Sequence, residues 1–532
     1  MTYDFVIVGA GSAGCVLANR LSANPAHRVL VLEAGGRDWH PFIHMPAGLA
    51  KLVNNKRINW DYHTEPQPGL AHRRLWWPRG KVLGGSSSIN AMCYTRGAPG
   101  DYDEWAALTG DARWAWDHVL PVFRRGEDNA RGEDRWHGVG GPLAVADLRH
   151  HNELSDVLVE AATAAGLARN LDFNGASQEG FGYYQVTQKN GARCSAATAY
   201  LAPARSRANL TLLTHALTHR VLLDGAQATG VEYSRRGRIE RVEAGRVVLA
   251  GGAINSPQLL MLSGIGPADH LREHGIEVRH ALAGVGANLQ DHLDICTLVR
   301  STRPITYDKT NDLLVALQFL FRRSGIGTSN IAEAGGFVRS RLAPDARCDL
   351  QFHFVPALLD QHGRHRLEGY GYTLHACALR PKSRGTIRLK SADPAAHPAI
   401  RPNYLCDPEG RDLAMMLEGA RLSREIFAQA PFAAYRGGEI FPGAQARSDA
   451  DLETFVRRKA ETIYHPVGTC RMGRDGDAVV DSELRVHGIE GLRVVDASVM
   501  PTLIGGNTNA PTMMIAERAA ELLVSTPAAH AR

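Results

Sequence analysis

Three glycines near the N-terminus have the spacing of a dinucleotide-binding turn, Gly9-x-Gly11-x-x-Gly14. The first permits a tight turn, the second lets the backbone approach a pyrophosphate, and the third lets a helix pack against a strand. Glu33 follows 19 residues after Gly14, and a carboxylate there suits a ribose 2′-hydroxyl and repels a 2′-phosphate. The pattern therefore predicts FAD or NAD(H) as the ligand. The alternative is a glycine turn that binds nothing.

Apolar segments on both sides of this turn supply the elements that would position it. Residues 5–8 and 29–32 are continuous apolar runs, suited to strands buried on both faces. Residues 16–21 between them have the apolar spacing of a helix. We therefore expect a strand, a helix and a strand, with Glu33 ending the second strand. Further β-like runs predict strands at 210–213, 221–223, 231–233, 247–249 and 492–495.

Two other glycine-rich segments could pass close to a flat or charged ligand. Residues 80–90 contain paired glycines and three serines, and residues 252–266 follow a predicted buried strand. Glycines allow close backbone approach, and the serine hydroxyls can donate hydrogen bonds. An ordinary glycine-serine turn is the alternative for the first segment.

These segments resemble the two signature patterns of the glucose–methanol–choline (GMC) family of FAD oxidoreductases. The first match continues through Asn90, Tyr94, Gly97 and Asp103. Residues 464–473 and 506–512 also resemble the family. With the N-terminal glycine turn, the resemblance extends over essentially the whole chain.

The resemblance implies an α/β fold, with a Rossmann-like FAD-binding domain and a discontinuous, sheet-based α+β substrate domain. The FAD-binding domain is expected to comprise residues 1–155, 206–295 and 461–532, the last carrying the catalytic residues. The substrate domain is expected to comprise residues 156–205 and 296–460.

The resemblance also implies hydride transfer from an alcohol carbon to flavin N5. The family's catalytic base corresponds to His465 and its second active-site position to Asn507, with Asn509 as the competing choice. Histidine suits proton transfer near neutrality, and a neutral amide can hold the same oxygen. A final helix is expected from about Pro511 to residue 523, capped by Asn509 or Ala510, with its positive end at the reduced flavin.

The residues expected to contact FAD come from all three segments of its domain. Binding is expected to be noncovalent, because Ile89 occupies the position where some relatives carry a histidine that bonds FAD. The expected contacts are Gly9, Gly11, Ser12, Ala13, Gly14, Glu33, Ala34, Val82, Gly85, Ser86, Asn90, Ala91, Met92, Cys93, Val221, Tyr464, Asp496, Ala497, Asn509, Pro511 and Thr512.

Within the family, the chain resembles the branch of choline dehydrogenases and of alcohol dehydrogenases of alkane degradation. Residues 43–46 and 184–191 resemble the latter. This implies oxidation of an aliphatic primary alcohol to an aldehyde, with electrons passed to a quinone or other carrier rather than oxygen. The alternatives are a choline or polyether-alcohol dehydrogenase, and an FAD-binding protein or lyase without net redox turnover.

Composition excludes several other classes. The net charge is only +5, and the basic residues form no stripe, so we expect no nucleic-acid partner. The eight cysteines are scattered without a CxxC pair, which favours reduced, buried thiols in a cytoplasmic protein. No apolar run reaches the length of a membrane span, and no signal peptide is evident. Peripheral attachment to the inner face of the cytoplasmic membrane stays open.

The remaining candidates receive ordinary structural interpretations. We expect no metal site, and we interpret His353, His362 and His365 as solvated loop histidines. Met513 and Met514 are expected in the core. All eight tryptophans lie between Trp39 and Trp136, where they would either pack a cover over the flavin or fill the core.

Overall fold

The N-terminal glycine turn follows a central parallel strand of a seven-stranded sheet. A computed structural model describes residues 2–52 and 54–525. The strand order is β10 (Leu210–Thr214), β2 (Val29–Glu33), β1 (Tyr3–Val8), β13 (Arg238–Leu249), β12 (Gln227–Arg235) and β11 (Ala216–Asp224), and β26 (Leu492–Val494) also pairs with β13. Strands β10, β2, β1, β13 and β26 run parallel. The strands predicted from the sequence are therefore all present.

The predicted strand–helix–strand unit is confirmed. Residues 5–8 of β1 and all of β2 are buried, as continuous runs of Val, Ile and Leu require of central parallel strands. Helix α1 (Ser12–Leu21) packs between them and the C-terminal helix α13 (Asn509–Ser525). Glu33 is the last residue of β2, as predicted.

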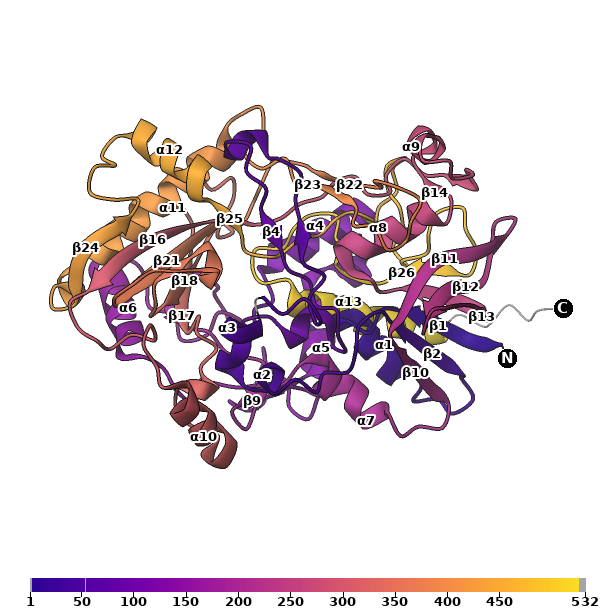
Figure 1. Cartoon of the computed structure of the whole chain (residues 1–532), viewed down its shortest axis with the longest axis horizontal. Coiled ribbons are helices and arrows are strands. Elements are labelled where there is room, and N and C mark those ends of the chain that lie inside the picture. The colour runs from indigo at the N-terminus through magenta and orange to yellow at the C-terminus, as the bar shows by residue number, and fades with distance from the viewer. Residues whose placement is uncertain (1, 53, 526–532) are drawn as a thin grey trace.

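A second seven-stranded sheet lies at the other end of the molecule's long axis (Figure 1). Its order is β24 (Arg436–Phe441), β16 (Leu293–Ser301), β21 (Gly371–Ala378), β18 (Leu350–Val355), β17 (Ala334–Val338) and β7 (Gly180–Tyr183), and β25 (Glu461–Thr462) also pairs with β16. Its pairings are antiparallel, and helices α6 (Glu153–Ala164) and α11 (Arg411–Ala428) pack against it.

The chain passes between the two sheets several times, which fits the expected discontinuous arrangement of a mixed α/β fold. Strand β16 begins at Leu293, three residues before the expected boundary at 296, and β25 lies in the segment assigned to the first domain. The other longer helices are α4 (Pro99–Thr109), α5 (Trp116–Gly126), α8 (Gly252–Leu262), α10 (Asp312–Arg322) and α12 (Asp449–Lys459). The domain limits themselves stay a prediction.

The final helix begins two residues earlier than predicted. Asn509 is its first helical residue rather than its cap, and Pro511 is its third residue rather than its first. The amide of Thr512 donates to the carbonyl of Thr508, so the hydrogen-bonded turns of the helix already start at Thr508. Proline is tolerated there because N–H groups of the first turn have no partner inside the helix.

Other expectations have mixed outcomes. Met513 and Met514 are buried, as predicted. Six of the eight free cysteines are buried, whereas Cys406 is exposed and Cys296 is partly exposed. Among the tryptophans, Trp60 and Trp76 line the large cavity described below, while Trp39 is exposed. No helix within residues 2–52 and 54–525 is long and apolar enough to cross a membrane.

Candidate active site

One cavity of about 420 Å³ extends from the glycine turn of the first sheet to side chains of the second. That volume is in the range of ligand and cofactor pockets. Its lining includes both predicted catalytic residues and most predicted cofactor contacts: His465, Asn507, Gly9, Gly11, Ser12, Ala13, Glu33, Ala34, Gly85, Ser86, Asn90, Ala91, Met92, Cys93, Tyr464, Asp496, Ala497, Asn509 and Thr512.

Four predicted cofactor contacts, Gly14, Val82, Val221 and Pro511, lie outside this lining. The Val221 amide donates to Ser263 Oγ, and the neighbouring residues 216–218 of β11 line the cavity instead. A Cβ on Gly14 would lie 1.9 Å from the Gly9 carbonyl oxygen, so Gly14 allows the helix to pack against the strand. The sequence pattern assigns that same packing role to its third glycine.

The glycine turn forms a cradle of exposed backbone. Gly9 has a φ of +100°, which strongly favours glycine. A Cβ on Gly85 would lie 2.7 Å from the Cα of Gly11, so the two loops touch through their backbones. Helix α1 has no side-chain cap, and its first turn lines the cavity. Free N–H groups and the positive end of a helix dipole suit a pyrophosphate.

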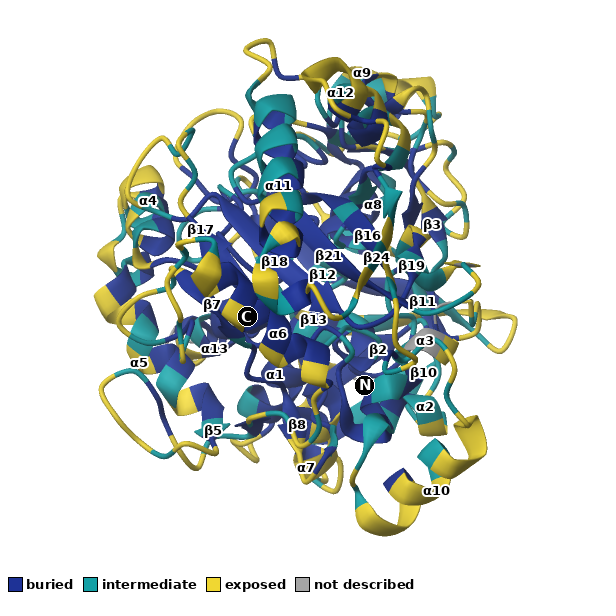
Figure 2. Ribbon diagram, turned by 90° about the vertical axis from the view of Figure 1, so that its left-hand side faces the viewer, coloured by how far each residue is buried: buried dark blue, intermediate teal, exposed yellow. Residues whose placement is uncertain are grey.

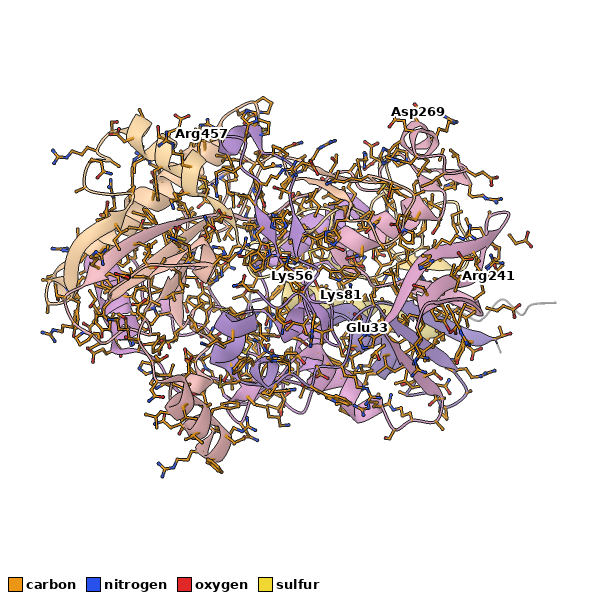
Figure 3. All side chains as sticks on the ribbon, in the orientation of Figure 1. Glu33, Lys56, Lys81, Arg241, Asp269 and Arg457 are labelled. Carbon is orange, nitrogen blue, oxygen red and sulfur yellow. The ribbon has the colours of Figure 1, made fainter. Side chains whose placement is uncertain are left out.

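Glu33 lies beside the glycine turn and accepts hydrogen bonds from backbone amides. Its two carboxylate oxygens accept the amides of Ala10 and Gly35, each at 2.8 Å. Burial raises the pKa of Glu33 to about 7, against the opposing effects of those amides and of Lys81, labelled with Glu33 in Figure 3. Nearby, the Thr218 hydroxyl is buried without a partner among the described residues and lines the cavity. These groups suit the hydroxyls and base of a nucleotide.

At the other end of the cavity, a chain of hydrogen bonds fixes which nitrogen of His465 is free. His292 Nε2 lies 3.3 Å from the Leu379 carbonyl oxygen, which can only accept. Because burial lowers the pKa of His292 to about 3, its ring is neutral and its Nδ1 is an acceptor. His465 Nδ1 lies 2.9 Å from that atom and must donate to it. The Nε2 atom of His465 therefore keeps its lone pair.

The surroundings keep His465 uncharged. Burial, followed by the neighbouring His292, His353 and Arg79, holds its pKa well below the ordinary value. Its backbone amide donates to Asp291 Oδ1 at 2.8 Å, which anchors the segment after β25. A neutral, oriented imidazole can accept a proton without first losing one.

Asn507 lies beside this free nitrogen. Its side-chain Nδ2 is 3.2 Å from His465 Nε2, and its Oδ1 accepts from Thr95 Oγ1 at 3.2 Å and Gln351 Nε2 at 3.0 Å. Both donors to Oδ1 fix the amide orientation, so that Nδ2 points toward His465. Asn509 instead accepts from Ser12 Oγ at 2.7 Å, at the glycine turn. Of the two asparagines, Asn507 is the one in contact with the histidine.

The interpretation of three histidines as solvated loop residues is wrong for two of them. His353 is 5% exposed on β18, and His362 is only partly exposed; both line the cavity. No strand is predicted from the sequence at residues 350–355, which form the buried strand β18. His365 is exposed, as expected. His292 and Asp291, which position His465, were missed, because nothing in the sequence around residues 290–292 predicts contact with residue 465.

Part of the cavity lining is apolar. Ile331, Ala332, Val355, Leu359 and Ile463 line the cavity together with the polar or aromatic side chains of His353, His362, His375 and Tyr464. The cavity thus joins the glycine cradle to a region that contains apolar side chains, a neutral imidazole and an amide donor. Such a pair can remove a proton from a hydroxyl group and hold its oxygen.

The chain is similar to known proteins over nearly its whole length. Residues 3–294 and 381–516 match the two models of the GMC oxidoreductase family. An alcohol dehydrogenase [acceptor] of Pseudomonas putida is 51% identical over 98% of this chain and 96% of its own. Human mitochondrial choline dehydrogenase is 47% identical over 99% of this chain and 90% of its own. The structure of an Aspergillus oryzae formate oxidase, studied for modification of its FAD, superposes with a TM-score of 0.91 at 28% identity, over 98% of both chains.

Proposed function

The chain belongs to the GMC oxidoreductase family and is an FAD-dependent alcohol dehydrogenase, and from this premise we propose that it oxidises aliphatic primary alcohols to aldehydes. The observation that carries the proposal is the unprotonated Nε2 of His465, held against Asn507 in the cavity.

The residues of the polar cradle fit FAD. The first turn of α1 would hold the pyrophosphate, and Glu33 would hold the ribose. The segment from Gly85 to Cys93 would contact the flavin. Ile89 lines the cavity and cannot form a bond to FAD, which supports noncovalent binding. When bound, FAD supplies the acceptor, at N5, for the hydride that leaves the alcohol carbon.

The proton chemistry belongs to the protein. An alcohol oxygen placed beside both groups donates its hydroxyl proton to His465 Nε2 and accepts a hydrogen bond from Asn507 Nδ2. As the proton moves, the ring becomes a cation, and its Nδ1–H keeps its bond to His292. Because the pKa of His465 is low, its imidazolium form releases that proton readily. The residue is then again a base for the next alcohol.

We propose an aliphatic substrate over choline because Ile331, Val355 and Ile463 supply apolar lining for an alkyl chain. Asp291, which accepts from the His465 amide, and Asp294 both lie outside the cavity lining. A quaternary ammonium group would be held by a carboxylate or an aromatic cage, and the lining offers the aromatic rings of Trp60, Trp76 and Tyr464 for this. The similarity to choline dehydrogenase keeps choline as the alternative substrate.

We propose a quinone or another non-oxygen carrier as the electron acceptor. The support is the similarity to the Pseudomonas putida enzyme, whose name gives an acceptor without specifying it. A quinone is dissolved in the membrane, so this proposal requires a surface that reaches lipid.

Helix α10 offers that surface. Leu313, Leu314, Leu317, Leu320 and Phe321 are between 43% and 76% exposed. Their spacing places them on one stripe of the helix, which projects from the body of the molecule (Figures 1 and 2). Apolar patches of this kind mark interaction or membrane-contact sites.

The neighbourhood of α10 favours an anionic bilayer as the occupant. Lys309 and Arg322 are exposed at the two ends of the helix, whereas Asp312 is paired with Lys51 at 2.6 Å. An apolar stripe flanked by cations is typical of helices that lie in the membrane interface. The free cysteines are compatible with a reducing compartment, so we propose the inner face of the cytoplasmic membrane.

This surface lies close to the cavity. The turn Ile326–Thr328 packs against both α10 and the turn Pro46–Gly48, which continues into α3 (Leu49–Leu52). Leu49 and Leu52 line the cavity. Contact of α10 with lipid would therefore bring this wall of the cavity near the membrane, where long-chain alcohols and quinones are dissolved.

The proposed reaction is tested by mixing the purified holoenzyme anaerobically with 1-alkanols and with choline. Bleaching of the flavin absorbance by 1-alkanols, faster than by choline, is the expected result. Faster bleaching by choline would favour the alternative substrate. No bleaching by any alcohol would favour an FAD-binding protein or lyase without net redox turnover.

A further inference from the structure

Beyond the catalytic pair, four metal-ligating side chains converge where the second sheet meets the cavity. Asp294 and Cys296 are two residues apart on β16, so they share one face of the sheet. His375 lies directly opposite Cys296 on the antiparallel strand β21. His362, from the turn Gln361–Gly363, completes the group.

The ligand atoms have the spacing of a tetrahedral site. Asp294 Oδ2 lies 2.7 Å from His375 Nδ1, 3.2 Å from His362 Nε2 and 3.6 Å from Cys296 Sγ, and Cys296 Sγ lies 3.0 Å from His375 Nδ1. All four ligand atoms lie within 4.8 Å of one another. Ligands at zinc bond lengths in a tetrahedron are roughly 3.3–3.8 Å apart, so the closest pairs would move apart and the most distant atoms closer together to admit the ion.

No lysine or arginine among the described residues forms an ion pair with the carboxylate of Asp294. Asp294 is fully buried, and among the described residues its ion pairs are with His362 and His375. Its Oδ1 atom is buried and has no hydrogen-bond partner among the described residues. The other nearby acids already have cations, since Asp360 pairs with Lys459 and Glu461 with Arg73. A buried carboxylate of this kind favours a cationic ligand.

We propose that Asp294, Cys296, His362 and His375 form a binding site for one divalent transition-metal ion of the zinc class. Histidine nitrogen, cysteine sulfur and carboxylate oxygen are the ligands that zinc prefers. Binding replaces the proton of the Cys296 thiol by the metal–sulfur bond and releases that proton to solvent. No electron is transferred, and both histidines bind as neutral rings.

The site is coupled to the active site by contact. His362 uses Nε2 toward Asp294, and its Nδ1 lies 2.6 Å from the Tyr464 hydroxyl. Tyr464 directly precedes His465, and His362 and His375 both line the cavity. A bound ion would fix His362 and the Tyr464 ring at the substrate end.

The test uses Co²⁺ as the probe with the oxidised holoenzyme and no alcohol, so its outcome does not depend on the proposed reaction. One Co²⁺ per chain, with a thiolate-to-cobalt charge-transfer band, is the expected result. The band should disappear in Cys296→Ser and persist in Cys406→Ser, whose thiol is exposed and outside the cluster. Retention of flavin absorbance shows that each variant is folded.

Equilibrium dialysis against Zn²⁺ gives a second measurement. The wild type and Cys406→Ser should retain one ion per chain, and Cys296→Ser should bind at least tenfold more weakly. Absence of stoichiometric metal in the wild type, or unchanged binding in Cys296→Ser, would overturn the proposal.

Discussion

His465 Nδ1 lies 2.9 Å from His292 Nδ1, and this contact determines which nitrogen of His465 can act as a base. His292 donates from Nε2 to the Leu379 carbonyl, so it can only accept from His465. The lone pair on His465 Nε2 then faces Asn507 and the cavity. We therefore propose that His292 is a positioning residue and that His465 is the catalytic base.

Replacing His292 tests this positioning role. His292→Leu removes the acceptor and should slow flavin reduction by alcohol by about tenfold or more, since the wrong tautomer of a catalytic histidine is strongly deleterious. His292→Asn keeps an acceptor oxygen and should recover much of the rate. Stopped-flow flavin reduction measures both. Equal losses in the two variants would indicate a merely structural role.

The pH dependence follows from the low pKa of His465. Its base form persists well below pH 6.5, where an ordinary histidine is half protonated. The rate of flavin reduction at saturating alcohol should therefore stay level from about pH 8 down to about pH 6 and fall only in more acidic solution. A midpoint at or above pH 6.5 would contradict the assignment. Fluorescence of released FAD serves as the control for loss of cofactor.

Cofactor retention should depend on Glu33. The pKa of about 7 means that the carboxylate gains a proton as the pH falls through neutrality, and the protonated group loses part of its capacity to accept from a ribose. Glu33→Ala should weaken FAD binding by about 10- to 100-fold, the value of a hydrogen bond to a charged group. Fluorescence titration of the apoprotein measures the affinity.

The matched control for Glu33 is Asp269→Ala, which removes an exposed carboxylate far from the cavity. Its FAD affinity should equal that of the wild type. Equal affinity of Glu33→Ala and the wild type would remove Glu33 from the cofactor site.

Helix α10 can be tested separately from the chemistry. Leu320→Glu with Phe321→Glu places two charges on the exposed apolar stripe. Sedimentation with phosphatidylcholine–phosphatidylglycerol vesicles should fall at least tenfold, with reduction by a soluble short-chain alcohol unchanged. The control is Ile239→Glu, an exposed apolar position on β13. Unchanged sedimentation of the double variant would exclude α10 as the lipid contact.

Local patterns predicted the first sheet and the cofactor cradle. The apolar runs of β1 and β2 and the glycine spacing depend on neighbouring residues, which is why sequence reveals them. The contact between His292 and His465 joins positions 173 residues apart. No local period carries such information, and the buried position of His353 depends equally on sheet pairing. The exposed face of α10 also emerges only when the packing of the whole chain is known.

The choice between Asn507 and Asn509 shows the same limit. The two residues have the same chemistry and lie two positions apart, but the turn before α13 points one at His465 and the other at Ser12. The error of two residues in the start of α13 had the same origin, because the cap depends on backbone geometry that proline alone does not fix.

The most direct test of the central claim is anaerobic single-turnover reduction of the flavin in His465→Ala. The variant should retain FAD, because the cofactor cradle is formed by other residues. Its rate of bleaching by a 1-alkanol should fall by more than about 10²-fold, the contribution expected of a general base. Bleaching at a rate near that of the wild type, with FAD bound, would contradict the role of His465.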